Sequence, residues 1–338
     1  MHYLKYDVID NLIGVRRFDL AGRLLFGAIL LLGVVVVPPS ASADILDEPE
    51  GLPWGVVDRI PAQQRNDNLL IKDMIVSNDR VYVGGYFLNV QEGRNGQRIS
   101  QQFLAAFDRA TGEWDSGFRP VVEGPVKELL LSPDGSRLFV AGDFDSINGD
   151  TGVSGLAALD PATGAVQQDF RVDVRWEYAQ ETLTVDALAT DGTFLYFGGR
   201  FSRVTALNQA NAYRNRIARI RLSDATLDNF NPQARGGFVA AMALDPAQNR
   251  LYVGGSFNSI DGVANTPEFA AIDTRTGDLS SGVQQGIRIG NTIEQYRNFH
   301  YPYDIEVFPG HVAWAGDQHI EVMRSSDLGS EFSGFVRN

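Results

Sequence analysis

The chain of 338 residues contains no cysteine, which excludes disulfides, thiol nucleophiles and thiolate metal sites together. Histidine is scarce as well, with four in the whole sequence. The patterns GxSxG and HExxH, the P-loop and the dinucleotide-binding glycine motif are all missing. These absences remove the common catalytic and cofactor sites, and no catalytic or cofactor-binding residue is predicted.

The sequence gives little support for a metal site. His300, His311 and His319 lie close together in the sequence, beside Asp304 and Asp317, and imidazole with carboxylate is a common ligand set. The strand pattern, however, places His311 at the opposite end of a strand from the other two. A calcium loop at GDFDSINGD (142–150) is not expected either, because Ile147 occupies a ligand position. No metal site is predicted.

One apolar run stands near the N-terminus. LLFGAILLLGVVVV (24–37) follows several basic residues and precedes the small residues Ala41-Ser42-Ala43. Its 14 residues fall short of the roughly 20 that span a bilayer. The pattern predicts a signal peptide over 1–43 and an exported protein, secreted, periplasmic or at the cell surface. Arg16-Arg17-Phe18 leaves the twin-arginine route open beside general secretion.

The charge is strongly acidic, with a formal net value of −13 at pH 7. Nucleic acid and anionic membrane surfaces are therefore poor partners. The simplest interpretation is that the acidic balance keeps an exported protein soluble.

What the sequence has in abundance is repetition. Strand-like segments ending in two small residues recur as VYVGGYF (from Val81), LFVAGDF (from Leu138), LYFGGRF (from Leu195) and LYVGGSF (from Leu251), and a degraded copy ends at Ala315. The first small residues of successive pairs are 57, 57, 56 and 61 residues apart. A fixed period of this length indicates a repeat architecture.

Each repeat has the same parts in the same order. An alternating segment and a turn precede the small pair, and a polar loop and a short apolar run follow it, with an Asp-x-x-Thr-Gly turn at 108–112, 160–164 and 273–277. Alternation favours strands, and these turn residues favour tight turns, so four short antiparallel strands per repeat are predicted. A glycine pair inside a strand indicates a close backbone approach or a bulge. One phenylalanine follows each complete pair and is expected to be buried between neighbouring repeats: Phe87, Phe144, Phe201 and Phe257.

Units of this kind are typical of β-propellers. The sequence therefore predicts an all-β chain in which residues 68–338 form a propeller of five blades, each with four antiparallel strands. A β-solenoid is the alternative, although its coils are usually shorter.

The repeated pattern L-Y-V-G-G-x-F, then L-A-x-L-D-x-x-T-G, then F-x-P also resembles a known group. It is similar to the repeats of secreted bacterial β-propeller proteins of unknown function, and it has the appearance of the kelch-like repeats of fungal cell-surface landmark proteins. The resemblance covers about Asn68 to the end of the chain. It implies a propeller and a location in the cell envelope, and it implies no reaction.

Residues 44–67 form a polar lead-in with one apolar segment, Leu52–Ile60. This segment is too short to add a blade, but an open ring would expose strand edges. We expect it to pair with the last repeat, near Ile320–Met323 or Phe332–Val336, and so to close the ring.

The candidate binding residues lie in long loops on one face, away from the tight turns. The loops 171–181 and 291–303 depart most from the repeat, and aromatic side chains beside charged ones suit a sugar ring or a protein partner. The alternative is that the loops bury their own aromatic residues. The candidates are Arg175, Trp176, Tyr178, Tyr296, Arg297, His300 and Tyr301.

The predicted function is an exported, non-catalytic scaffold that binds a protein or glycan without a cofactor. The alternative is a glycoside hydrolase or lyase acting on extracellular polysaccharide, which would need a pair of carboxylates at a defined separation. The sequence offers many acidic residues and does not single out a pair.

Overall fold

A computed structural model of the chain describes residues 54–59, 71–93, 95–178, 182–261, 263, 266, 268–283, 301–316 and 319–335. Every regular element in these ranges is a β-strand, and the strands pair in antiparallel fashion. The predicted all-β class is confirmed. Within the same ranges no helix is long and apolar enough to cross a membrane. The predicted signal peptide lies outside the described residues.

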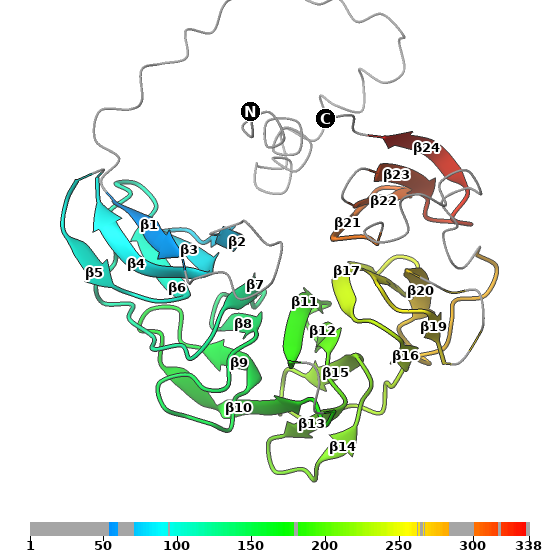
Figure 1. Cartoon of the computed structure of the whole chain (residues 1–338). Coiled ribbons are helices and arrows are strands. Elements are labelled where there is room, and N and C mark those ends of the chain that lie inside the picture. The colour runs from blue at the N-terminus through cyan, green and yellow to red at the C-terminus, as the bar shows by residue number, and fades with distance from the viewer. Residues whose placement is uncertain are drawn as a thin grey trace, which may run out of the picture. The chain divides into compact units, whose positions relative to one another are not determined.

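Each sequence repeat forms its own sheet core, and the strand that comes first in the chain stands at one edge (Figure 1). The first strands of consecutive repeats contact one another: β2 with β7, β7 with β11, β11 with β17, and β17 with β21. The strands of the five repeats are, in order, β2 (Ile71–Val76), β3 (Arg80–Gly85) and β6 (Leu104–Asp108); β7 (Val126–Leu131), β8 (Leu138–Gly142), β9 (Gly155–Leu159) and β10 (Val166–Arg175); β11 (Thr184–Thr190), β12 (Phe194–Arg200) and β15 (Ile217–Arg221); β17 (Val239–Asp245), β18 (Arg250–Gly255) and β20 (Phe269–Asp273); β21 (Asp304–Phe308), β22 (His311–Ala315), β23 (His319–Arg324) and β24 (Ser330–Phe335).

The prediction of four strands in every repeat is wrong for the first and third repeats, and the described part of the fourth repeat, up to residue 283, also has three strands in its sheet. A fourth strand is present in the second and fifth repeats, but in the other three a single residue bridges the sheet edge: Trp114, Leu227 and Leu279. Beyond that residue the chain turns inward and buries an aromatic side chain, as at Phe118 and Phe230. The second repeat also buries the equivalent ring, Phe170, yet keeps its fourth strand, β10, so ring burial does not by itself end the edge strand.

The hydrophobic core lies between repeats rather than within them. Phe87, Phe144, Phe201 and Phe257 are fully buried. Phe144, Phe201 and Phe257 lie in clusters between repeats, as predicted, whereas Phe87 packs among side chains of the first repeat and β1. The cluster around Phe144 combines side chains of the first repeat with those of the second, and the same holds for the second with the third, the third with the fourth and the fourth with the fifth. Each sheet therefore depends on its neighbour for burial of its apolar face.

The first glycine of each pair faces the innermost strand of the next repeat. A Cβ atom added at Gly84 would lie 2.6 Å from Val126 Cγ1, and one at Gly198 would lie 2.5 Å from Met242 Cε. At Gly254 it would lie 3.2 Å from Ile305 Cδ1. These positions lack a side chain because the apolar residue of the following repeat fills the space.

The second glycine faces the backbone of its own repeat. A Cβ at Gly142, Gly199 or Gly255 would strike the carbonyl oxygen of Pro125, Thr184 or Phe238, respectively. The innermost strand bulges beside each of these contacts, and a bulge brings the backbone closer to the neighbouring strand. The expected reasons for the glycine pair, close approach and a bulge, both hold.

The expectation that Leu52–Ile60 pairs with the last repeat is wrong. β1 (Trp54–Arg59) pairs instead with β4 (Phe87–Glu92) of the first repeat, with Val56 opposite Val90. β5 (Arg98–Ser100) completes that sheet on the other side of β4.

The same pairing recurs at each junction between repeats. The residue three positions after the buried Phe pairs with the outgoing segment of the preceding repeat: Ile147 with Val122, Val204 with Val174 and Ile260 with Ala234. The strands involved are β10 with β13 (Arg203–Ala206) and β16 (Ala234–Arg235) with β19 (Ser259–Ile260), and β14 (Ala212–Tyr213) extends β13. β1 thus takes the place that an outgoing segment takes at the other junctions.

Replacing Gly199 with alanine should destabilise the protein by about 1–3 kcal/mol, because the new methyl group overlaps a backbone carbonyl that a bulge holds in place. The midpoint of urea unfolding measures this loss. Gly55→Ala is the matched control, since no atom lies within 4 Å of the added Cβ, and it should change stability by at most about 0.5 kcal/mol. Equal unfolding midpoints for the two variants would contradict the packing argument.

Candidate binding surface

The tight turns gather on one face, which we call the turn face. Backbone hydrogen bonds join the first turn of a repeat to its second: Arg109 N donates to Asp79 O at 2.8 Å, and Thr274 N donates to Asn249 O at 2.9 Å. Leu222 N donates to Thr193 O at 2.9 Å in the third repeat. The predicted grouping of the tight turns is therefore confirmed.

Aspartates on the turn face cap their own turns. The backbone amide of Thr111 is the main reason that the pKa of Asp108 lies below its usual value. The Arg275 side chain and backbone hold the pKa of Asp273 at about 2. These carboxylates are ionised at neutral pH, and local hydrogen bonds use part of their accepting capacity.

The long loops meet on the opposite face, as predicted. We call this the long-loop face, and its best-described part consists of the loops 171–184 and 202–216. Ser202 N donates to Arg175 O at 2.9 Å, and Ser202 Oγ accepts from Glu177 N at 3.1 Å. The segment that leaves the second repeat is thereby fixed to the loop of the third.

Trp176 and Tyr178 form the centre of this part of the face. Their ring centroids are 5.0 Å apart, and the guanidinium carbon of Arg216 lies 5.0 Å from the Trp176 ring. Arg216 is buried, and its Nε donates to Gly237 O at 2.6 Å. Trp176 is half-buried and Tyr178 is exposed, so an anchored indole supports an accessible phenol.

Charged side chains flank the two rings. Arg203 Nε lies 2.9 Å from Glu177 Oε1, and Arg175 Nε lies 2.8 Å from Asp173 Oδ1. Burial raises the pKa of Asp173 despite its pairing with Arg175. Arg175 Nη2 also donates to Thr151 O, at 3.3 Å, so the guanidinium contacts two residues of the second repeat. Among the described residues of the sequence-predicted group, the structure shows a ring contact only between Trp176 and Tyr178.

Tyr301 belongs to a second aromatic group. Its ring centroid is 5.3 Å from that of Phe238 and 4.8 Å from that of Tyr303, and the guanidinium of Arg200 lies 5.1 Å from the Phe238 ring. The hydrogen bond from Arg216 to Gly237 O places this group next to the first. We call the combined set of Trp176, Tyr178, Phe238, Tyr301 and Tyr303 the aromatic strip.

Three predicted site residues, Tyr296, Arg297 and His300, lie outside the described residues. Sequence reasoning missed Arg200, Arg216 and Phe238. A signal for Arg200 was present, because it is the variable residue of its own GGxF motif. Arg216 and Phe238 carry no pattern that separates them from ordinary loop residues.

A buried ion cluster at Lys127 was also missed. Lys127 Nζ lies 2.9 Å from Asp143 Oδ1, 2.8 Å from Asp186 Oδ1 and 2.8 Å from Thr184 Oγ1. Lys127 is the bulged residue of β7 and Asp143 is the variable residue of its AGDF motif. Asp186 and Thr184 come from β11, so the cluster ties the second repeat to the third.

The Lys127 cluster has a structural role, because it links the second repeat to the third. Burial alone would lower the pKa of Lys127, but the attraction of Asp186 and Asp143 outweighs it, and the pKa is raised. An amine held in the ammonium form does not act as a nucleophile or a general base.

The histidines do not form a metal centre within the described ranges. His311 Nε2 lies 2.8 Å from Glu331 Oε2, and its ring stacks on Phe308 with centroids 5.2 Å apart. In the part of the chain that the structure describes, no three His, Asp or Glu side chains come close enough together to hold a metal ion.

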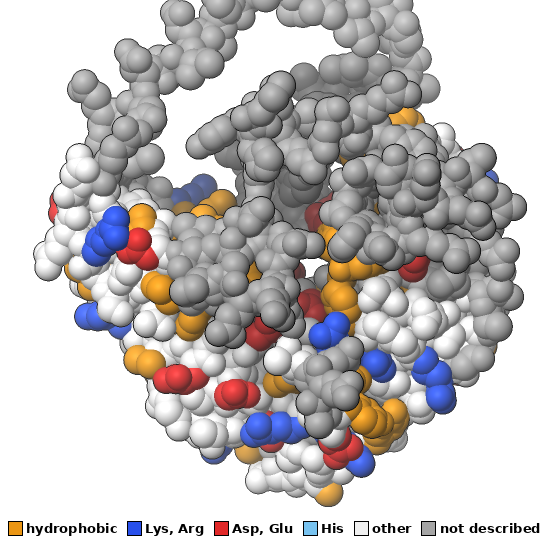
Figure 2. All heavy atoms as spheres, in the orientation of Figure 1, with side chains coloured by type: hydrophobic (Ala, Val, Ile, Leu, Met, Phe, Trp, Pro, Cys, Tyr) orange, Lys and Arg blue, Asp and Glu red, His pale blue; other side chains and the backbone are white. Residues whose placement is uncertain are grey.

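Charges on the visible face are mixed in sign. Figure 2 shows acidic, basic and hydrophobic side chains intermingled over its described part. The described part of this face therefore shows no continuous patch of one charge sign.

No model of a known protein family matches the chain, and a search of curated proteins gives no match.

Replacing Lys127 with methionine should destabilise the protein by about 3–5 kcal/mol, because two half-buried carboxylates lose their buried counter-ion. Urea unfolding at pH 7 measures the loss.

The triple variant Lys127→Met, Asp143→Asn, Asp186→Asn is the control. It removes the whole charge set and should retain most of the parent's stability. A single variant as stable as the parent at pH 7 would contradict the assigned role of the cluster.

Proposed function

We propose that this protein is an exported, non-catalytic five-bladed β-propeller that binds a glycan or protein partner through its long-loop face. The fold part of the proposal rests on the packing of each small pair against the innermost strand of the next repeat. The binding part rests on the aromatic strip, which lies where the sequence departs from its own repeat.

Closure of the five repeats into a ring is supported by one set of equivalent residues. Leu129, Leu188, Met242 and Ile305 occupy the same position of the innermost strand, opposite the strand that carries the small pair. All four are 7% exposed or less, whereas their equivalent in the first repeat, Met74, is 42% exposed.

In the proposed ring, the last repeat packs against Met74. Leu129 and Ile305 each lie against the first small residue of the preceding repeat, Gly84 and Gly254. By the same rule Met74 requires a small residue from a repeat that precedes the first, and Ala315 of the fifth repeat, which is half-exposed, fits that requirement. The position of β1 as an incoming link supports the same arrangement.

The double variant Met74→Cys, Ala315→Cys tests closure. The chain has no cysteine of its own, so any disulfide must involve the introduced residues. A closed ring should form an intramolecular disulfide, seen as faster migration on a non-reducing gel. The pair Met74→Cys, Val263→Cys is the control, since Val263 is an exposed residue of the fourth repeat, and it should not cross-link within one chain.

A second measurement uses stability alone. Met74→Ala should cost about 2–5 kcal/mol, the loss also expected for Leu129→Ala, if the last repeat covers Met74. A cost below about 0.5 kcal/mol, the value for an exposed site, together with an unlinked cysteine pair, would contradict closure.

The aromatic strip favours a glycan as the ligand. Tyr178 presents an exposed ring beside a half-buried indole, and ion pairs flank both. Rings of this kind offer a flat apolar surface with a polar tip, which suits the mixed faces of a sugar. The export signal expected from the sequence would place the protein where polysaccharides occur.

Binding of the labelled chain to an array of microbial and plant glycans tests this function. Tyr178→Ala should weaken binding to any positive glycan by about tenfold or more, as expected for loss of a central aromatic contact. Phe308→Ala is the matched control, because Phe308 is an exposed aromatic residue at the turn-face end of β21. Its binding should equal that of the parent.

The positive glycans are then incubated with the protein and analysed by mass spectrometry. Intact glycans support a binding scaffold. Cleaved products that disappear on a single Asp or Glu substitution would contradict it, and an array without any binding would contradict a glycan ligand.

A further inference from the structure

A cavity of about 290 Å³ opens on the turn face of the first repeat. Its walls come from the turn between β2 and β3 and from the segment that follows β6. The residues that line it are Asp79, Arg80, Asp108, Glu113, Trp114 and Asp115. This volume lies near the lower limit for ligand pockets, so a small group fits it.

The aromatic wall is a departure from the repeat. Trp114 holds the bridging position that Val166, Leu227 and Leu279 hold in other repeats. A second tryptophan, Trp54 of β1, packs beside it with ring centroids 5.5 Å apart, and Trp54 Nε1 donates to Glu113 Oε2 at 2.8 Å. A branched aliphatic side chain would serve the sheet edge equally well, so the indole adds something that the fold does not require.

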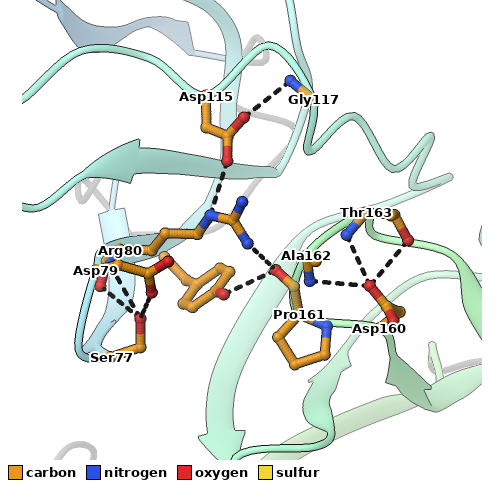
Figure 3. A network of polar contacts seen from close by, with 10 residues as sticks. Ser77, Asp79, Arg80, Asp115, Gly117, Asp160, Pro161, Ala162 and Thr163 are labelled. Atoms are coloured by element: carbon orange, nitrogen blue, oxygen red, sulfur yellow. Dashed lines mark hydrogen bonds and ion pairs between the residues drawn. The ribbon is translucent and has the colours of Figure 1, made fainter.

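Arg80 is committed to structure. Its Nε lies 2.8 Å from Asp115 Oδ2, and its Nη1 donates to Pro161 O at 2.9 Å. Figure 3 shows Arg80 reaching from its strand between Asp115 and the Pro161 carbonyl of the next repeat. Arg80 and Asp115 therefore neutralise each other, and the remaining carboxylates set the charge of the cavity.

Those remaining groups are Asp79, Asp108 and Glu113. Hydrogen bonds from Thr111 keep the pKa of Asp108 below its usual value. Within the described residues, the Asp79 side chain accepts one hydrogen bond, from Ser77 Oγ at 3.1 Å. The lining therefore has more acidic than basic side chains, next to an indole ring.

Negative groups beside an aromatic face attract a cation with spread charge. The indole already holds one such group, since the Arg119 guanidinium lies 5.3 Å from the Trp114 ring centroid, and Arg119 is not part of the cavity wall. A bare metal ion fits less well, because the described carboxylates do not come together as a ligand set. We propose that this cavity binds one organic cation, an ammonium or guanidinium group, carried by a small molecule or by a basic side chain of a partner.

Titration of the full chain with acetyl-arginine amide tests the site. The chain has four tryptophans, so its ¹⁵N–¹H spectrum contains four indole signals, and the one missing in Trp114→Phe identifies Trp114. That signal should shift with saturation. Acetyl-citrulline amide, which has the same shape without the charge, should leave it in place.

A matched pair of variants tests the charge. Asp79→Asn should weaken binding of the arginine probe about two- to fivefold, the size of one exposed charge contact. Asp134→Asn should not change it, because Asp134 holds the corresponding turn of the second repeat, with Ser132 Oγ donating to it at 2.6 Å, and does not line the cavity.

The source of the cation is read from a third probe, the peptide Gly-Gly-Arg-Gly-Gly. Binding at least tenfold tighter than that of acetyl-arginine amide assigns the site to a partner's side chain, and equal binding assigns it to a free cation. Equal shifts with the arginine and citrulline probes, or no saturation, would overturn the proposal. The site lies on the face opposite the aromatic strip, so this result is independent of the glycan experiment.

Discussion

The contact between a glycine and the next repeat's innermost strand is the constraint on which the structure depends. Gly84, Gly198 and Gly254 leave room for an apolar side chain of the following repeat, and the adjoining glycine lets the strand accept a bulge from its own sheet. Each pair therefore fixes two distances, one within a sheet and one between sheets. A larger residue at either position would separate the strands and open the core clusters that lie between repeats.

The contact also has a direction, from each repeat to the one that follows. A series built this way has one unfilled position at its start and one unused small residue at its end, here Met74 and Ala315. Joining the two, as the proposed closure requires, would place Ala315 against Met74 and cover that exposed side chain. The same logic applies to the link segments, where β1 pairs with β4 as the outgoing segments of other repeats pair with their successors.

The sequence predicted the features that recur with strong residue types. The small pairs, the buried phenylalanines and the Asp-x-x-Thr-Gly turns each reappear at a fixed offset, and each is required by local geometry. The fourth strand failed because one bridging residue, such as Leu227 or Leu279, satisfies the edge before the chain turns inward. The pairing of β1 failed because its equivalents, Val122, Val174 and Ala234, are ordinary apolar residues that form no visible motif.

Trp176, Tyr178 and Tyr301 were predicted because their loops depart from the repeat, whereas Lys127, Arg200 and Trp114 escaped prediction for a different reason. Repetition identifies what five units share, whereas binding needs residues that one unit has alone. Lys127 and Arg200 occupy variable places within repeated motifs, and Trp114 replaces an aliphatic residue at a repeated bridge. Each is recognisable as an exception only after the repeat is aligned by strand pairing. Comparison of one position across the five repeats therefore distinguishes a residue that the fold requires from a residue that a ligand would require.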